Sequence, residues 1–170
     1  MYYLIVMFFQ DNKLTEIEPQ AFSSLANLAH LDVTGNRMTK LEDIMMRYPS
    51  NLKALYLDDN RLASFHRETF SGQTSMDVLS LSENKLERIP AGVFDELINL
   101  FRLSLANNRI AVIEDNALNG LHRVTHISFS SVHICLYFGL KEAAKRASNA
   151  SFVLSWWCPH CKKAWRLWDL

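Results

Sequence analysis

The 170-residue sequence predicts an α/β solenoid, in which short strands from successive coils stack into one parallel sheet. Asparagine recurs at a constant interval of 24 residues, and apolar residues recur in register around each asparagine. Just before each asparagine the apolar residues alternate, as they do in a half-buried strand. The five asparagines are Asn12, Asn36, Asn60, Asn84 and Asn108.

Each asparagine has apolar residues eight, five and three positions before it, and two, five and ten positions after it. In the fourth copy these residues are Met76, Leu79, Leu81, Leu86, Ile89 and Phe94. Side chains alternate along a strand, so the residues five and three before the asparagine share one face. Stacked copies then bury a continuous apolar core that no single copy could bury alone.

Two further columns are expected inside the solenoid. The chain must turn sharply after each strand, and a buried asparagine offers two donors and an acceptor to the backbone groups left without sheet partners. The position ten after each asparagine predicts a second internal spine, with aromatic packing between coils. That column reads Phe22, Met46, Phe70, Phe94 and Leu118.

The segment Met76–Leu97 follows the pattern L-x-x-L-x-L-x-x-N-x-L-x-x-I-P-x-x-x-F-x-x-L most fully. The sequence from about residue 4 to residue 145 therefore resembles the typical class of leucine-rich repeat, found in secreted proteins and receptor ectodomains. The resemblance implies a right-handed solenoid, a short horseshoe arc with its sheet on the concave side. Its convex side is expected to be mostly irregular or to contain short helical turns.

The repeats divide the chain into two parts. Residues 1–145 form the predicted solenoid of about six repeats, the last of them degenerate because Val132 stands where asparagine belongs. Residues 146–170 form a tail rich in Trp and Cys, and Lys141–Ala150 reads as a short helix. Met46 and Pro49 in the second repeat and Gln73 in the third depart from the pattern, which predicts a different convex side there.

The first nine residues are apolar and admit two interpretations. They lack a basic region and a small-residue cleavage site, and Leu4, Met7 and Phe9 fall in the repeat register. We therefore expect a first strand rather than a signal peptide, with Ile5, Val6 and Phe8 facing solvent. The missing signal peptide and the bare first coil indicate a fragment of a longer protein.

The tail carries the one chemically suggestive cluster, Cys158-Pro159-His160-Cys161 among four tryptophans. It resembles the start of the cysteine-rich cap that closes extracellular leucine-rich-repeat domains, which implies a disulfide between Cys158 and Cys161. Its C-x-x-C spacing departs from the family's usual C-x-C, and the sequence ends at Leu170 with the cap incomplete. Three alternatives stay open: a dithiol redox pair, half a zinc site, or a tail without an evolved role.

Composition narrows the function further. Basic and acidic residues balance at 18 each, with a mildly acidic body and a basic tail. No strand or helix face gathers a basic stripe, so we expect no nucleic-acid binding by the body. No apolar stretch is long enough to cross a membrane. We find no catalytic set or phosphate-binding loop, and we expect no enzyme activity, cofactor or metal.

The expected function is binding of a protein ligand by the exposed strand positions of the concave face. The residues selected there are His30, Asp32, Tyr56, Asp58, Asp59 and Arg102. Asp32, Tyr56, Asp58 and Asp59 form a predicted acidic patch with one aromatic anchor, suited to a basic partner.

The resemblance places the chain outside the cell, in a receptor or adhesion protein such as the Toll-like innate-immune receptors. Asn149-Ala150-Ser151 is a sequon for N-glycosylation at Asn149, which agrees with that compartment. A cytoplasmic scaffold with Cys135, Cys158 and Cys161 reduced is the alternative.

Overall fold

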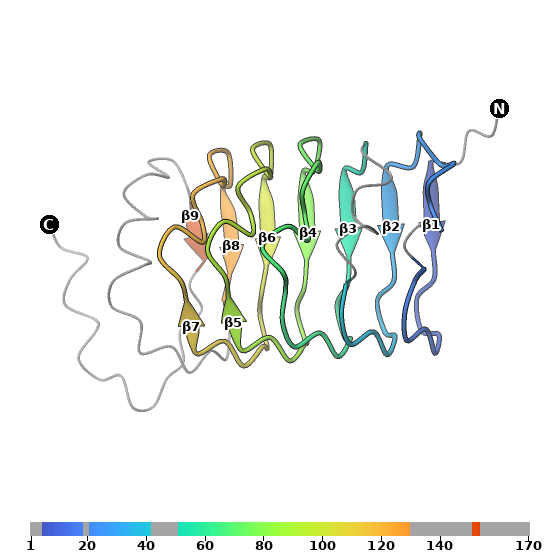
Figure 1. Cartoon of the computed structure of the whole chain (residues 1–170), viewed down its shortest axis with the longest axis horizontal. Helices are drawn as coiled ribbons and strands as arrows, with labels where there is room; N and C mark the ends of the chain where they lie inside the picture. The colour runs from blue at the N-terminus through green and yellow to red at the C-terminus, as the bar shows by residue number, and fades with distance from the viewer. Residues whose placement is uncertain (1–4, 19–20, 42–50, 130–150, 154–170) are drawn as a thin grey trace, which may run out of the picture.

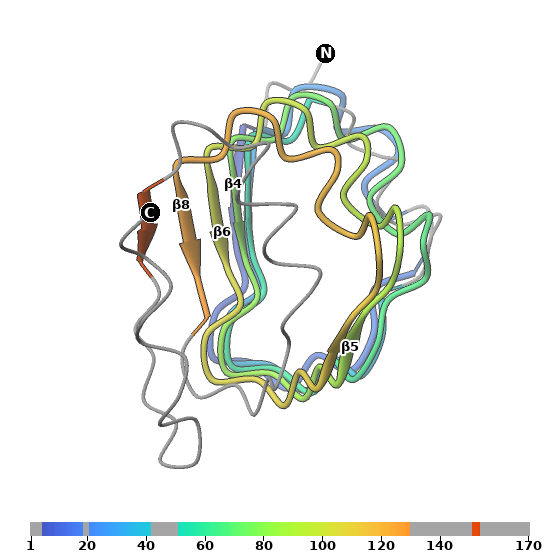
Figure 2. The same ribbon diagram turned by 90° about the vertical axis from the view of Figure 1, so that its left-hand side faces the viewer.

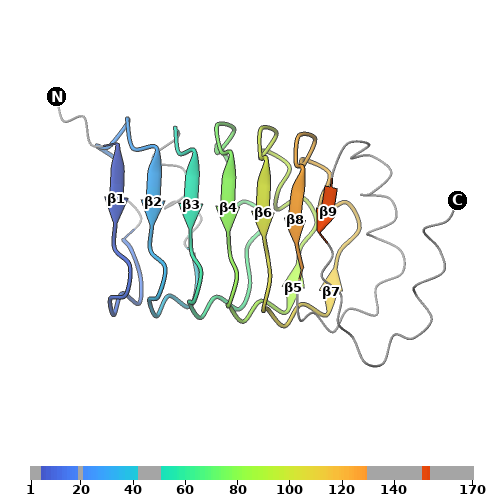
Figure 3. The ribbon, with the colours of Figure 1, turned by 180° about the vertical axis from the view of Figure 1, so that it is seen from behind.

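A computed structural model describes residues 5–18, 21–41, 51–129 and 151–153. Within them, seven short strands form one parallel sheet in the order β1-β2-β3-β4-β6-β8-β9 (Figures 1 and 3). The strands are β1 Val6–Phe8, β2 His30–Asp32, β3 Ala54–Tyr56, β4 Val78–Ser80, β6 Arg102–Ser104, β8 His126–Ser128 and β9 Ser151–Val153. The predicted parallel-sheet solenoid is confirmed.

The register of the sheet follows the sequence period. Each residue of β2, such as Leu31, pairs with the residue 24 positions later, here Leu55. The last pair differs, because Ile127 of β8 lies opposite Phe152 of β9, 25 positions later. The sheet thus extends to Ser151–Val153, within residues 146–170, which we predicted to form the tail.

The convex side faces away from this sheet (Figure 2). Its described residues form turns and one two-stranded parallel sheet, made by β5 Arg88–Ile89 and β7 Val112–Ile113. The turns are closed by backbone bonds between residues three apart, such as Leu97 N–H to Phe94 C=O at 3.0 Å. The described ranges contain no helix, so apart from β5 and β7 the convex side is irregular there, which is one of the two forms expected from the sequence.

The core consists of the apolar columns read from the repeat. The central residue of each inner strand is buried, as Leu31, Leu55 and Leu79 are. On the convex side Phe70 stacks on Phe94 with 6.0 Å between ring centroids, which is the predicted aromatic packing between coils. Gln73 is also buried, at a position that holds Leu97 in the following coil.

The first coil packs less completely than the others. Met7 and Phe9 are half-buried against the core, while Ile5, Val6 and Phe8 are exposed. β1 is the edge strand of the sheet, so its core-facing side chains have described neighbours on one side only. The register of β1 with β2 agrees with the interpretation of this segment as a first strand.

Several expectations fall on residues outside the described ranges. They are Met46 and Pro49, Val132, the helix at 141–150, the glycosylation site Asn149, the four tryptophans, and Cys135, Cys158 and Cys161.

The asparagine column binds each coil to the coil before it. Asn84 Nδ2 donates to the carbonyl of Leu57 in the preceding coil at 2.8 Å, and to those of Leu81 and Ser82 in its own coil at 3.2 and 3.1 Å. Its Oδ1 accepts the backbone N–H of Leu62 at 3.0 Å. Equivalent bonds surround Asn36, Asn60 and Asn108, and all four side chains are buried.

Asn12 is the exception in this column. It is exposed and, among the described residues, donates only to the carbonyls of Phe9 and Gln10 in its own coil, at 3.1 and 2.9 Å. It belongs to the coil of the edge strand β1, so it bridges no pair of described coils.

Replacing Asn84 by Ala should destabilise the protein by about 2–4 kcal/mol, because buried carbonyl and N–H groups lose their partners. Asn12→Ala is the matched control, and it should cost much less, since its carbonyl partners lie at an exposed site. Urea unfolding followed by circular dichroism measures both. Equal losses for the two variants would contradict this role.

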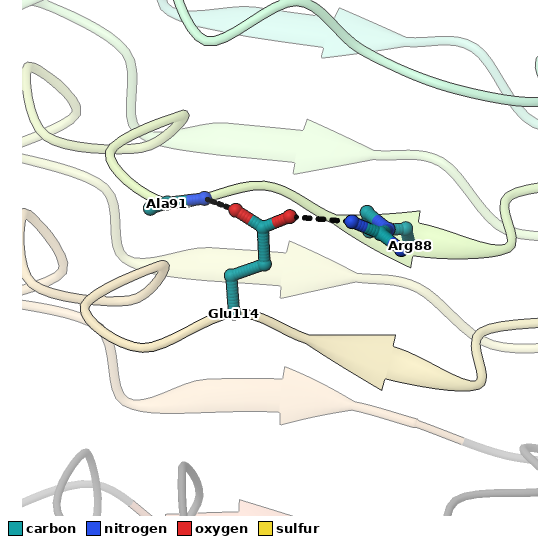
Figure 4. Close-up of polar contacts among 3 residues, drawn as sticks. All are labelled: Arg88, Ala91 and Glu114. Atoms are coloured by element: carbon teal, nitrogen blue, oxygen red, sulfur yellow. Dashed lines mark hydrogen bonds and ion pairs between the residues drawn. The ribbon is translucent and has the colours of Figure 1, made fainter.

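One ion pair ties the two strands of the convex sheet. Arg88 donates to Glu114 Oε1 at 2.9 Å, and the Ala91 backbone N–H donates to Glu114 Oε2 at 2.9 Å (Figure 4). These groups hold the pKa of Glu114 below its ordinary value of 4.5, the Ala91 N–H contributing most and the Arg88 hydrogen bond next. Both favour the ionised carboxylate.

This lowered pKa predicts how stability depends on pH. Because the pKa is lower in the folded state than in the unfolded state, the stabilisation is present above the unfolded pKa and is lost as pH falls through the folded pKa. Glu114→Gln should therefore lower the melting temperature at pH 7, and the difference from the unmodified protein should shrink as the pH falls below the ordinary pKa of 4.5. Glu87→Gln, an exposed glutamate of the preceding coil, is the control. A difference that did not change with pH would refute the assignment.

Candidate protein-binding face

The outward side of the seven-stranded sheet, which we call the strand face, corresponds to the concave face expected from sequence. Parallel pairing places equivalent residues side by side and so orders the strand face in rows. The first row reads Val6, His30, Ala54, Val78, Arg102 and His126. The second row reads Phe8, Asp32, Tyr56, Ser80, Ser104 and Ser128.

The second row changes character along the solenoid. Over β1 to β3 it carries Phe8, Asp32 and Tyr56, whereas over β4, β6 and β8 it carries serines. Phe8 is 69% exposed, and Tyr56 is half-buried. The aromatic and acidic residues selected from the sequence therefore gather at one end of the strand face.

Two of the predicted acidic residues also have structural roles. Asp32 accepts from the Gln10 side chain at 2.7 Å and from the Thr34 backbone N–H at 3.0 Å. Asp58 Oδ1 accepts from the Ser80 hydroxyl at 2.6 Å and from the Ser82 backbone N–H at 2.7 Å. These bonds fix both carboxylates in place beside Tyr56, and each residue remains partly exposed.

Asp59 lies apart from Asp32 and Tyr56. It follows the strand, in a turn where its φ is +48°, a left-handed conformation that asparagine, aspartate and glycine adopt most easily. The same turn position holds Asp11, Gly35, Glu83 and Asn107, all with positive φ. The predicted acidic patch is thus divided between the strand face and the turns beyond it.

The other two selected residues, His30 and Arg102, are exposed and share the first row. Two strands lie between them, so they are separated by roughly 14 Å at the usual strand spacing. His126 lies next to Arg102 in this row, and its ring contacts Phe101 with 5.3 Å between centroids. Sequence reasoning missed the Phe101 contact, because Phe101 precedes its strand and falls in no core column.

A groove of about 800 Å³ runs along the turns at the carboxyl ends of the strands. The turn residues Gly35, Asp59, Glu83 and Asn107 line it, together with the asparagine column and the basic residues that follow the asparagines. Sequence reasoning missed it because only strand and helix faces were inspected. The signal was present at the position after each asparagine, which reads Lys13, Arg37, Arg61, Lys85 and Arg109.

The described residues contain neither a cluster of metal-binding side chains nor a helix that could span a membrane. No group of three or more His, Cys, Asp or Glu side chains is arranged there to hold a metal ion. Among the same residues, no helix is long and apolar enough to cross a membrane.

Comparison with known proteins identifies the repeat. Residues 1–43 and 50–110, more than half of the chain, match the family model of the leucine-rich repeat. The chain belongs to the leucine-rich-repeat family. A comparison of this leucine-rich-repeat protein with curated proteins finds no match.

Solved structures agree with the leucine-rich-repeat assignment. The TLR13–ssRNA13 complex has 25% identity and a TM-score of 0.72 over 75% of this chain. The APL1 leucine-rich repeat domain has 25% identity and a TM-score of 0.73 over 79%. The Toll–Spatzle complex of Drosophila, at 23% identity, shares the fold with a TM-score of 0.76 over 82%.

This leucine-rich-repeat chain spans only part of those proteins. It covers 18% of the TLR13 chain, 35% of the APL1 chain and 18% of the Toll chain. The family and these neighbours support a binding scaffold that resembles receptor ectodomains.

Proposed function

We propose that this protein is a non-catalytic part of an extracellular receptor and binds a protein ligand through its strand face. The observation that supports this proposal is the pairing register of the strands. It places the central residue of each strand in the core and the flanking residues in continuous rows on the strand face. The neighbours support the compartment, because TLR13 and Toll are receptors whose complexes contain single-stranded RNA and Spatzle.

The acidic and aromatic end of the strand face is the proposed contact. Hydrogen bonds hold the side chains of Asp32 and Asp58 in place, so these side chains lose little conformational entropy when a ligand binds. In the second row, Asp32 lies between Phe8 and Tyr56. Tyrosine is among the residues that dominate binding energy at interfaces. Fixed carboxylates around an aromatic side chain suit a ligand with a basic surface.

The size of the strand face sets the scale of the interface. Seven strands at about 4.8 Å spacing span roughly 29 Å along the solenoid. A standard interface buries about 800 Å² on each partner. Because each strand is only three residues long, the strand face supplies part of a standard interface, and the Asp32–Tyr56 end is the proposed main contact within it.

The test uses binders selected against the immobilised full chain from a displayed library of secreted proteins. Tyr56→Ala should weaken the selected binders roughly 30-fold, as truncation of an interface hot spot does. Asp58→Asn, which keeps an acceptor for the Ser80 and Ser82 bonds, should weaken basic binders through loss of charge alone. Arg67→Ala, in a convex turn, is the control. Binders that tolerate both strand-face variants and are lost on Arg67→Ala would place the site elsewhere.

The compartment is tested separately by counting free thiols after expression through a secretory pathway. An extracellular protein with the proposed Cys158–Cys161 disulfide should show one thiol before reduction and three after it. A cytoplasmic scaffold should show three thiols in both measurements. Three free thiols in the secreted protein would contradict the extracellular proposal.

A further inference from the structure

The groove at the carboxyl ends of the strands carries an unbroken column of positive charge, which we call the basic column. It consists of the residues that follow each asparagine: Lys13, Arg37, Arg61, Lys85 and Arg109. All five are exposed, and the last four line the groove. None of their side chains makes an ion pair or hydrogen bond with the residues that the structure describes. Their charges are therefore available to a ligand.

The backbone holds this column at a regular spacing. The N–H of Arg61 donates to the Met38 carbonyl at 2.8 Å, and the N–H of Lys85 donates to the Leu62 carbonyl at 2.9 Å. Arg37 and Arg109 are held in the same way. Successive cations are thus about 4.8 Å apart at the backbone, and five of them extend over roughly 19 Å. A ligand that matches the basic column must be linear and must carry repeated negative charge.

The residues that precede the asparagines give the groove a second kind of lining. They are Asp11, Gly35, Asp59, Glu83 and Asn107, of which the last four line the groove, so the lining carries carboxylates at Asp59 and Glu83. Its spacing is fixed too, since Asp59 N–H donates to the Ser82 carbonyl at 3.0 Å. A carboxylate accepts hydrogen bonds from hydroxyl groups and repels phosphate or sulfate. The ligand should therefore present hydroxyl groups to these carboxylates and anions to the basic column.

We infer that the groove binds a linear sulfated polysaccharide, with its sulfate groups along the basic column and its hydroxyl groups toward Asp59 and Glu83. Single-stranded nucleic acid fits less well, because no aromatic side chain lines the groove to stack with bases. The site is separate from the strand face, so it adds a second partner to the proposed protein ligand.

The experiment measures binding of heparin to the full chain by isothermal titration calorimetry. The groove variant combines Arg37→Gln, Arg61→Gln and Arg109→Gln, and the control variant combines Lys53→Gln, Arg67→Gln and Arg123→Gln. Both lose three exposed charges, and both keep the basic segment 141–170. The groove variant should bind heparin roughly 10–100-fold more weakly, and the control roughly threefold or less. Equal weakening of the two variants would overturn the proposal.

Two further measurements use the unmodified protein, so a folding defect in a variant cannot affect them. Heparin should protect Lys85 from acetylation in the unmodified protein while Lys53 reacts as before; equal protection of the two lysines would overturn the assignment. A single-stranded RNA of equal charge should bind more weakly than heparin. RNA that bound as tightly as heparin, with the same dependence on the groove variant, would replace the polysaccharide by a nucleic acid.

Discussion

The structure depends on the bonds that each buried asparagine makes between neighbouring coils. Asn60, for example, donates to the Val33 carbonyl of the preceding coil at 3.0 Å and accepts the Met38 N–H at 3.0 Å. The chain leaves the strand at this point, and without the side chain these backbone groups would be buried without partners. A hydrophobic column alone could not meet this requirement. The asparagine therefore fixes both the turn and the distance to the preceding coil.

Fixing the turn also creates the surfaces on which binding is proposed. One residue before the asparagine, the chain enters a left-handed conformation at Asp59 and Glu83. One residue after it, the backbone N–H of Arg61 bonds to the preceding coil and its side chain faces outward. The strand residues before this turn form the strand face. One structural unit, repeated along the chain, thus presents a row of varied side chains and a row of cations.

Sequence reasoning was most successful where burial enforces a period. The columns of Leu55 and Leu79 were readable because the core accepts only apolar side chains there. The groove was not predicted, because exposed turn residues obey no such rule and were grouped with the strand positions. Asp59 was therefore assigned to the same patch as Asp32. Asn12 shows a second limit, since its residue type matches the column although no described coil lies before it.

The sequence by itself determined the repeat: the spacing of 24, the apolar positions that form the core, and the asparagine that closes each turn. These features follow from the alternation of apolar and polar residues along each strand and from the cost of burying polar groups, and both leave a pattern in the linear sequence. Only the tertiary structure decided which exposed residues share a surface, because that depends on register between coils. It also decided that Phe152 lies opposite Ile127 one residue out of period, since strand pairing tolerates a longer connecting loop.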